Sequence, residues 1–235
     1  MVRYRSHLLK YAGEFIIIFS SITFTWWFDD WRQERDDLKE EVVLLNNLNS
    51  NLEIDSANIQ NELDYILRSE FTFNDFLEKL KAGNFKDTDS SGLLIRRLII
   101  APEFHPNNAT FEAIKATGEL KLIRDDSLVN AMMNLYEVSY QELDFLLGVY
   151  NQTSTQTIWN YAIENHDLTR VLGSPQDRIF KFEMGKSEDR QLLINKIMFT
   201  KMAVTYSKFR MANCLERISD VRRRIKWRLT DLKAS

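Results

Sequence analysis

The feature that most constrains this chain is an apolar residue at every seventh position along two long stretches. The first row comprises Leu38, Leu45, Leu52, Ile59, Ile66, Phe73 and Leu80. The second row comprises Ile197, Val204, Met211, Ile218, Ile225 and Leu232. A repeat of seven places one apolar stripe along a helix that packs against other helices. Only 7 Gly and 3 Pro occur in 235 residues, so few positions can end such helices.

These patterns predict an all-α fold with three long helices and a small helical insert. The expected helices lie at residues 31–82, 126–165 and 187–233, and the insert lies at residues 90–124. We expect Asp126 to cap the second long helix.

The packing partner of the first helix can also be predicted. An additional apolar row on the same predicted helix accompanies the row that begins at Leu38. It is formed by Val42, Leu48, Leu63, Phe76 and Leu77. Asn49, Ser56 and Glu70 interrupt this additional row. The interruptions favour an antiparallel, coiled-coil-like bundle with the chain's own later helices over a two-stranded zipper.

Residues 8–28 read LLKYAGEFIIIFSSITFTWWF. At about 1.5 Å per residue, a helix of this length covers roughly 30 Å, the thickness of the hydrocarbon layer of a bilayer. Trp26 and Trp27 suit the headgroup level, and no cleavage site follows the apolar run. The sequence therefore predicts one retained transmembrane anchor in residues 1–30 and an extramembrane helical domain in residues 31–235.

Basic residues around this segment predict its orientation. Arg3, Arg5 and Lys10 precede the apolar run without an acidic residue, whereas Arg32 and Arg35 follow it among several carboxylates. The positive-inside rule then predicts a cytoplasmic N-terminus and a periplasmic body on a bacterial inner membrane. The basic counts on the two sides are close, so a cytoplasmic body is the alternative.

Polar residues share one side of the predicted span. On a helix that turns about 100° per residue, Lys10, Glu14, Ser21 and Thr25 lie along one stripe. Because polar groups facing lipid are costly, we expect the spans to associate through this stripe into a homo-oligomer. Lys10 and Glu14 reaching the interface, with the hydroxyls bonding their own helix, is the alternative. A buried helix of a soluble protein is the alternative to the anchor itself.

A short segment between the first two long helices combines polar caps with apolar residues. Asn107 or Asn108 is the expected N-cap of a helix that contains Phe111, and Gly118 is its expected left-handed C-cap. We predict a structural clamp that packs against the long helices. A ligand pocket lined by the two asparagines and Arg124 is the alternative.

The blocks KYAGEFIIIFSSITFTWWFDDWRQER and PNNATFEAIKATGELKLIRDDSLVNAMMNLYE resemble an uncharacterised family of bacterial membrane-anchored proteins common in Bacteroidota. Together they cover about a quarter of the chain, and the second is the more specific. The resemblance implies an N-terminal transmembrane helix and a helical extramembrane domain. It implies no chemistry, because the family has no assigned activity. The chain departs from the family in the polar residues Ser20, Ser21, Thr23 and Thr25 of the span.

Catalytic and metal-binding patterns are missing from the sequence. His7, His105 and His166 are isolated from one another, and Cys214 is the single cysteine. None of them stands at a metal-ligand spacing, and there is no phosphate-binding glycine loop or nucleophile elbow. We therefore predict no enzymatic activity, no metal site and no cofactor.

A cluster of basic residues lies near the C-terminus and includes Trp227. It comprises Arg222, Arg223, Arg224, Lys226 and Arg228. Such a cluster can bind anionic lipid or nucleic acid. Basic residues also suit the last turns of a helix through its dipole, and the net charge of −3 provides no global attraction to nucleic acid. We favour a solvated helix face, with nucleic acid disfavoured as a partner.

These observations predict a non-enzymatic, membrane-anchored helical scaffold, assembly or sensor component of the cell envelope. Its expected partners are the lipid bilayer, further copies of the same chain and, as an option, another membrane protein. A pore-forming or ion-conducting effector gated by the helical domain is the main alternative. A membrane-tethered nucleic-acid or nucleotide binder is the third.

Overall fold

The computed structural model describes residues 2–82, 102–165 and 187–234. The side chains of residues 2–13, 72, 162, 165 and 187–189 lie outside this description. Within the described ranges every regular element is a helix, so the all-α prediction is confirmed.

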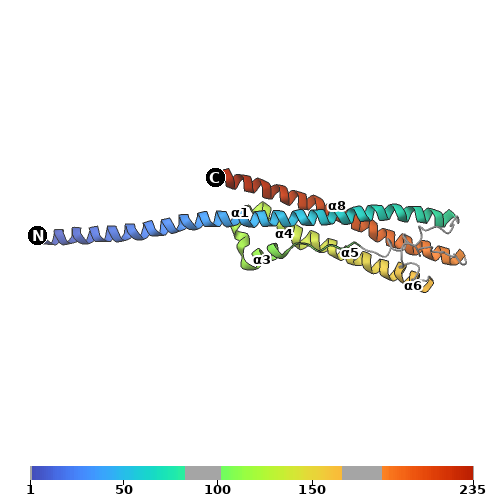
Figure 1. Ribbon diagram of the computed structural model, residues 1–235. Helices are drawn as coiled ribbons and strands as arrows, with labels where there is room; N and C mark the ends of the chain where they lie inside the picture. Colours follow the sequence, from blue (N-terminus) through green and yellow to red (C-terminus); the bar gives the residue numbers. More distant parts are fainter. Residues whose placement is uncertain (1, 83–101, 166–186, 235) are drawn as a thin grey trace.

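The first element, α1 (Val2–Ala82), is one continuous helix of 81 residues. Gly13 is its single glycine and it contains no proline, so no residue forces a break. The apolar row with seven-residue spacing runs along the packed face of α1. Its six members from Leu45 to Leu80 are all buried. The N-terminal part of α1 extends well past the other helices as a single rod (Figure 1).

The last element, α8 (Ser187–Ala234), runs antiparallel to α1 along the bundle (Figure 1). The apolar residues of α8 that recur at every seventh position from Ile197 to Ile225 are buried against α1 and the middle helices. Two ion pairs fix the alignment of the two helices, Lys208 with Glu70 at 2.6 Å and Arg222 with Glu53 at 3.1 Å. The predicted antiparallel packing is therefore present between α1 and α8, whereas the helix formed by residues 126–165 runs parallel to α1 (Figure 1).

The third long helix extends from Asp126 to Asn165 in five consecutive pieces. These are α4 (Asp126–Asn134), η2 (Leu135–Ser139), α5 (Tyr140–Ser154), η3 (Thr155–Trp159) and α6 (Asn160–Asn165). The pieces η2 and η3 are π-helical turns that interrupt the α-helix without ending it.

The cap of this helix differs from the prediction by one residue. Asp125 has an extended backbone, and its side chain accepts a 3.0 Å hydrogen bond from the Leu128 N–H, whereas Asp126 is already helical. Both residues are aspartates, so composition alone does not separate them. The N-cap is the residue whose backbone is not yet helical.

A small unit precedes this helix and lies against the middle of α1 (Figure 1). It contains α3 (Ala109–Thr117) and the 3₁₀ turn η1 (Glu119–Leu122). Residues 90–101 of the predicted insert lie outside the described residues.

Candidate functional site

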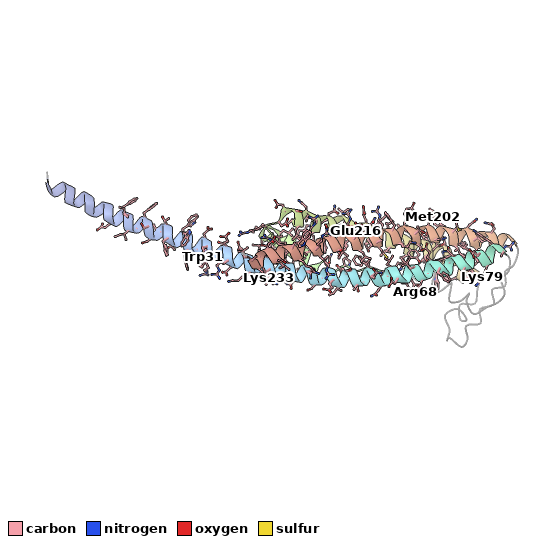
Figure 2. The ribbon with its side chains drawn as sticks, turned by 90° about the horizontal axis from the view of Figure 1, so that it is seen from above. Trp31, Arg68, Lys79, Met202, Glu216 and Lys233 are labelled. Atoms are coloured by element: carbon pink, nitrogen blue, oxygen red, sulfur yellow. The ribbon has the colours of Figure 1, made fainter. Side chains whose placement is uncertain are left out.

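The part of α1 that extends beyond the bundle carries a dense set of large, exposed apolar side chains. Their exposed fractions range from 69% at Trp26 to 43% at Trp31. The set, called here the apolar rod, comprises Phe15, Ile16, Ile17, Ile18, Phe19, Ile22, Phe24, Trp26, Trp27, Phe28 and Trp31. Figure 2 shows Trp31 on the part of α1 just outside the bundle, next to the bundle end where Lys233 of α8 lies. Apolar surface this extensive is unusual on a protein surrounded by water.

Three hydroxyl groups among these residues, those of Ser21, Thr23 and Thr25, bond within their own helix. Ser21 Oγ donates to the Ile17 carbonyl at 2.7 Å, and Thr25 Oγ1 donates to the Ser21 carbonyl at 2.8 Å. Such back-bonding satisfies the hydroxyl without a second helix. Of the predicted association stripe, Glu14, Ser21 and Thr25 are exposed and the Lys10 side chain lies outside the described residues. The hydroxyls therefore need no neighbouring helix, and association through the stripe stays a prediction.

Among the described parts of the chain, no helix is both long enough and apolar enough to cross a membrane. The length and apolarity of the described helices therefore do not support the predicted transmembrane helix. Glu14 and the four hydroxyl residues at positions 20, 21, 23 and 25 dilute the apolar run. Residues 8–13 of the predicted span lie outside the described side chains.

Inside the bundle, the carboxylate of Asp55 connects three segments. Asp55 is fully buried on α1. Its Oδ1 accepts hydrogen bonds from the backbone N–H and the Nδ2 of Asn107, at 2.9 and 2.8 Å. Its Oδ2 accepts a 2.8 Å hydrogen bond from the Tyr140 hydroxyl on α5. Three donors stabilise this buried charge. Burial, and then the Asp55 charge, hold the pKa of Tyr140 far above its ordinary value.

The caps of α3 agree with the prediction at one end and differ from it at the other. Gly118 has φ 75°, the left-handed conformation of a C-cap, and its N–H bonds the Lys115 carbonyl. At the N-terminus, Asn108 holds the cap position but its side chain makes no capping hydrogen bond. Asn107 binds Asp55 instead. The predicted N-cap position is therefore confirmed at Asn108, whereas the capping side-chain hydrogen bond is absent.

An aromatic cluster holds α3 against the long middle helix. Phe111 is fully buried, and its ring stacks on Tyr136 with centroids 4.2 Å apart and planes 7° apart. Tyr136 meets Tyr140 edge-on at 5.1 Å, and Phe104 meets Tyr140 edge-on at the same separation. Such pairs contribute beyond their buried area. The cluster and the Asp55 network together fix this small unit in place.

Two polar contacts complete the attachment to α1. The Nδ2 of Asn51 donates to the Thr110 Oγ1 at 2.9 Å. Arg124 forms a 3.0 Å ion pair with Glu34, close to the end of the apolar rod. Of the residues considered for a ligand pocket, Asn107 and Arg124 thus bind α1 directly. The geometry favours the clamp over the pocket.

A second buried carboxylate anchors the C-terminal end of α8. Glu41 on α1 has no exposed side-chain surface, and Arg228 binds it through Nε at 2.7 Å and through its second amino group at 2.9 Å. The planar guanidinium matches the two carboxylate oxygens. The hydrogen bond to Glu41 raises the pKa of Arg228 above its already high value.

The other arginines of the predicted basic cluster are also paired within the protein. Arg222 pairs with Glu53, whereas Arg223 and Arg224 both pair with Asp220. The Arg224 hydrogen bond, first among several causes, lowers the pKa of Asp220. These pairs neutralise much of the cluster, which favours the solvated helix face over a nucleic-acid interface.

Sequence reasoning missed the two buried acids. Glu41, Asp55 and Ser69 stand fourteen residues apart, in the same helical row as Leu48 and Phe76, and all five are buried. An acidic residue at a core position of a seven-residue repeat is the signal that could have found them. Such a residue needs a buried partner.

The described part of the chain contains no candidate metal site and no exposed thiol. No group of three or more His, Cys, Asp or Glu side chains there could hold a metal ion. Cys214 is buried in the core, where burial and the Asp55 charge raise the pKa of its thiol to about 12. A thiol of this kind is inert at neutral pH.

Comparison with known proteins adds no relative: no protein-family model, curated protein or solved structure matches the chain. The resemblance seen in the sequence stays a prediction.

Proposed function

We propose that this protein is a non-enzymatic helical scaffold held at a bacterial membrane by the apolar rod. The observation that carries the proposal is the exposure of eleven large apolar side chains on one unaccompanied stretch of helix. At roughly 25 cal/mol per Å², leaving this surface in water is unfavourable by many kcal/mol. A lipid phase removes that cost.

The arrangement of side chains along the rod suits a bilayer. Isoleucine and phenylalanine side chains occupy its first part, and Trp26, Trp27 and Trp31 gather at the end nearest the bundle. Tryptophan prefers the interface between hydrocarbon and headgroups, so this end marks the membrane surface. Arg35 lies over the Trp31 ring at 5.0 Å, as expected of a basic residue at headgroup level.

The body has the properties of a rigid support. The three long helices share one core, and the clamp fixes α3 through Asp55 and Phe111. With the N-terminus in the cytoplasm, the body stands in the periplasm and can position a partner at a set distance from the membrane. Self-association through the polar stripe belongs to the same proposal, because the exposed Glu14 faces a lower cost beside a second helix.

Membrane extraction at alkaline pH tests the anchoring. The full chain should stay with the membrane pellet, whereas Ile18→Lys with Ile22→Lys should release it, since each lysine costs roughly 2.5–3.5 kcal/mol near the centre of a span. Phe71→Lys with Phe145→Lys is the matched control, because these rings are 77% and 69% exposed on the body. Retention of both variants, or release of the unchanged chain, contradicts the proposal.

A reporter enzyme fused after residue 235 tests the orientation. A reporter that works only in the periplasm should be active. Activity of a cytoplasm-dependent reporter would place the body on the opposite side.

A further inference from the structure

The helix α8 carries a second apolar face that does not contribute to the bundle core. Its members, called here the outer stripe, are 44–60% exposed. They are Leu192, Met198, Phe199, Met202, Tyr206 and Phe209. Figure 2 shows Met202 at the edge of the bundle formed by α8, on the side away from Arg68 and Lys79 of α1.

The spacing within this stripe is that of a helix-packing seam. Phe199, Met202, Tyr206 and Phe209 follow one another at intervals of three, four and three residues. These are the intervals at which one helix meets another in a coiled coil. On a helix wheel the seam lies opposite the buried row of Ile197, Val204 and Met211, so it faces away from the core.

The same helix contains an internal contrast. Two repeats further on, the positions equivalent to Phe199 and Met202 are Asn213 and Glu216, followed by Asp220 and Arg223. The outward face of α8 is therefore apolar near its start and polar from Asn213 to Arg223, before the exposed Trp227. The composition of the helix as a whole does not explain the stripe.

We propose that the outer stripe is the contact surface for a second copy of this chain, with the two α8 helices packed parallel and in register. Equivalent residues then meet across a two-fold axis, Met202 against Met202 and Phe209 against Phe209. Six large side chains that are each about half exposed provide on the order of 600 Å² per copy, approaching the roughly 800 Å² per partner of a stable interface.

The two flanks of the seam differ in charge. One flank carries Lys196, Ala203 and Arg210, and the other carries the uncharged side chains Gln191, Met198 and Thr205. In a parallel pair the basic flank of one copy meets the uncharged flank of the other. Arg210 forms a 2.8 Å ion pair with Glu142 of its own chain, and Lys196 donates to the Thr157 carbonyl at 3.3 Å, so the parallel orientation follows from the shared membrane and not from these charges.

The choice of a second copy as the partner rests in part on the proposed function. Two chains anchored in the same membrane stand side by side, in the same direction and at the same height. This arrangement raises the effective concentration of one α8 for another and imposes the register that the stripe needs.

Disulfide cross-linking of the full chain in vesicles tests the inference. In a Cys214→Ala background, Met202→Cys and Phe209→Cys should each form covalent dimers with themselves on oxidation. Phe71→Cys and Phe145→Cys, at more exposed positions on the body, report random collision and should cross-link about tenfold less. Adding Phe199→Glu to the Met202→Cys chain should lower its cross-linking by a similar factor, whereas Asn213→Glu should not.

Three results would overturn the inference. Equal cross-linking at all four positions would mean collision alone. Cross-linking only when Met202→Cys and Phe209→Cys chains are mixed would mean antiparallel packing. Monomeric chains at both seam positions would mean that another segment or partner covers the stripe. Alkaline extraction separates these failures from a failure of anchoring, because it does not depend on the outer stripe.

Discussion

Arg228 on α8 encloses the carboxylate of Glu41 on α1 with two hydrogen bonds, and Glu41 has no exposed side-chain surface. The pair joins residues 187 positions apart in the sequence. It lies near the point where α1 leaves the bundle toward the apolar rod, so it fixes the end of α8 to α1 there.

Removal of Arg228 should strongly destabilise the body. Arg228→Ala leaves the buried Glu41 charge without a partner, which costs about 3 kcal/mol of unfolding free energy. Chemical denaturation of the full chain in detergent measures this. In a Glu41→Gln background the same substitution should cost much less, because no charge is left unpaired. An equal cost in both backgrounds would contradict the buried ion pair.

The Asp55 network should depend on the Tyr140 hydroxyl. Tyr140→Phe removes one of three donors to a buried carboxylate and should lower the unfolding free energy by about 1–3 kcal/mol. Tyr150→Phe is the control, because the buried Tyr150 hydroxyl has no hydrogen-bond partner among the described residues and its removal should not lower the unfolding free energy. Equal stability of the two variants would mean that the hydroxyl bond to Asp55 contributes nothing.

The clamp should depend on Phe111. Because this ring is fully buried against Tyr136, Phe111→Ala should cost about 3–5 kcal/mol in denaturant unfolding. Phe145→Ala, which trims an exposed ring, should cost about 0.5 kcal/mol or less. An unchanged unfolding curve for Phe111→Ala would reject the clamp and favour a ligand site near Asn107.

Cys214 should make stability depend on alkaline pH. Its pKa is about 12 in the folded chain and roughly 8.5 when unfolded, so the folded state keeps the proton longer. The stabilisation is fully present below about pH 8.5 and is lost as the pH rises toward 12. Denaturation at pH 7 and pH 10 should show a larger loss for the natural chain than for Cys214→Ala. Identical losses would contradict the burial of the thiol.

Local patterns predicted the helices well because their causes are local. The apolar rows through Leu45 and Ile197 and the left-handed cap at Gly118 follow from short-range spacing and backbone freedom. The pairs Glu41 with Arg228 and Asp55 with Tyr140 could not be predicted, because they depend on the alignment of α1 with the antiparallel α8 and with the parallel α5. Residue type alone does not separate Asp125 from Asp126 as the N-cap, and it does not show that Asn107 binds Asp55 instead of capping α3.

The accessibility of spin labels on α1 tests the anchoring most directly. Labels are placed in a Cys214→Ala background at Ile18, Ile22 and Val43, whose side chains are 60%, 64% and 57% exposed on the same helix. In vesicles, the account predicts that the first two labels collide with dissolved oxygen far more than with a water-soluble nickel chelate. The Val43 label should show the reverse, because it lies beyond the rod. Preferential collision with the nickel chelate at all three positions would contradict insertion of the apolar rod into the bilayer.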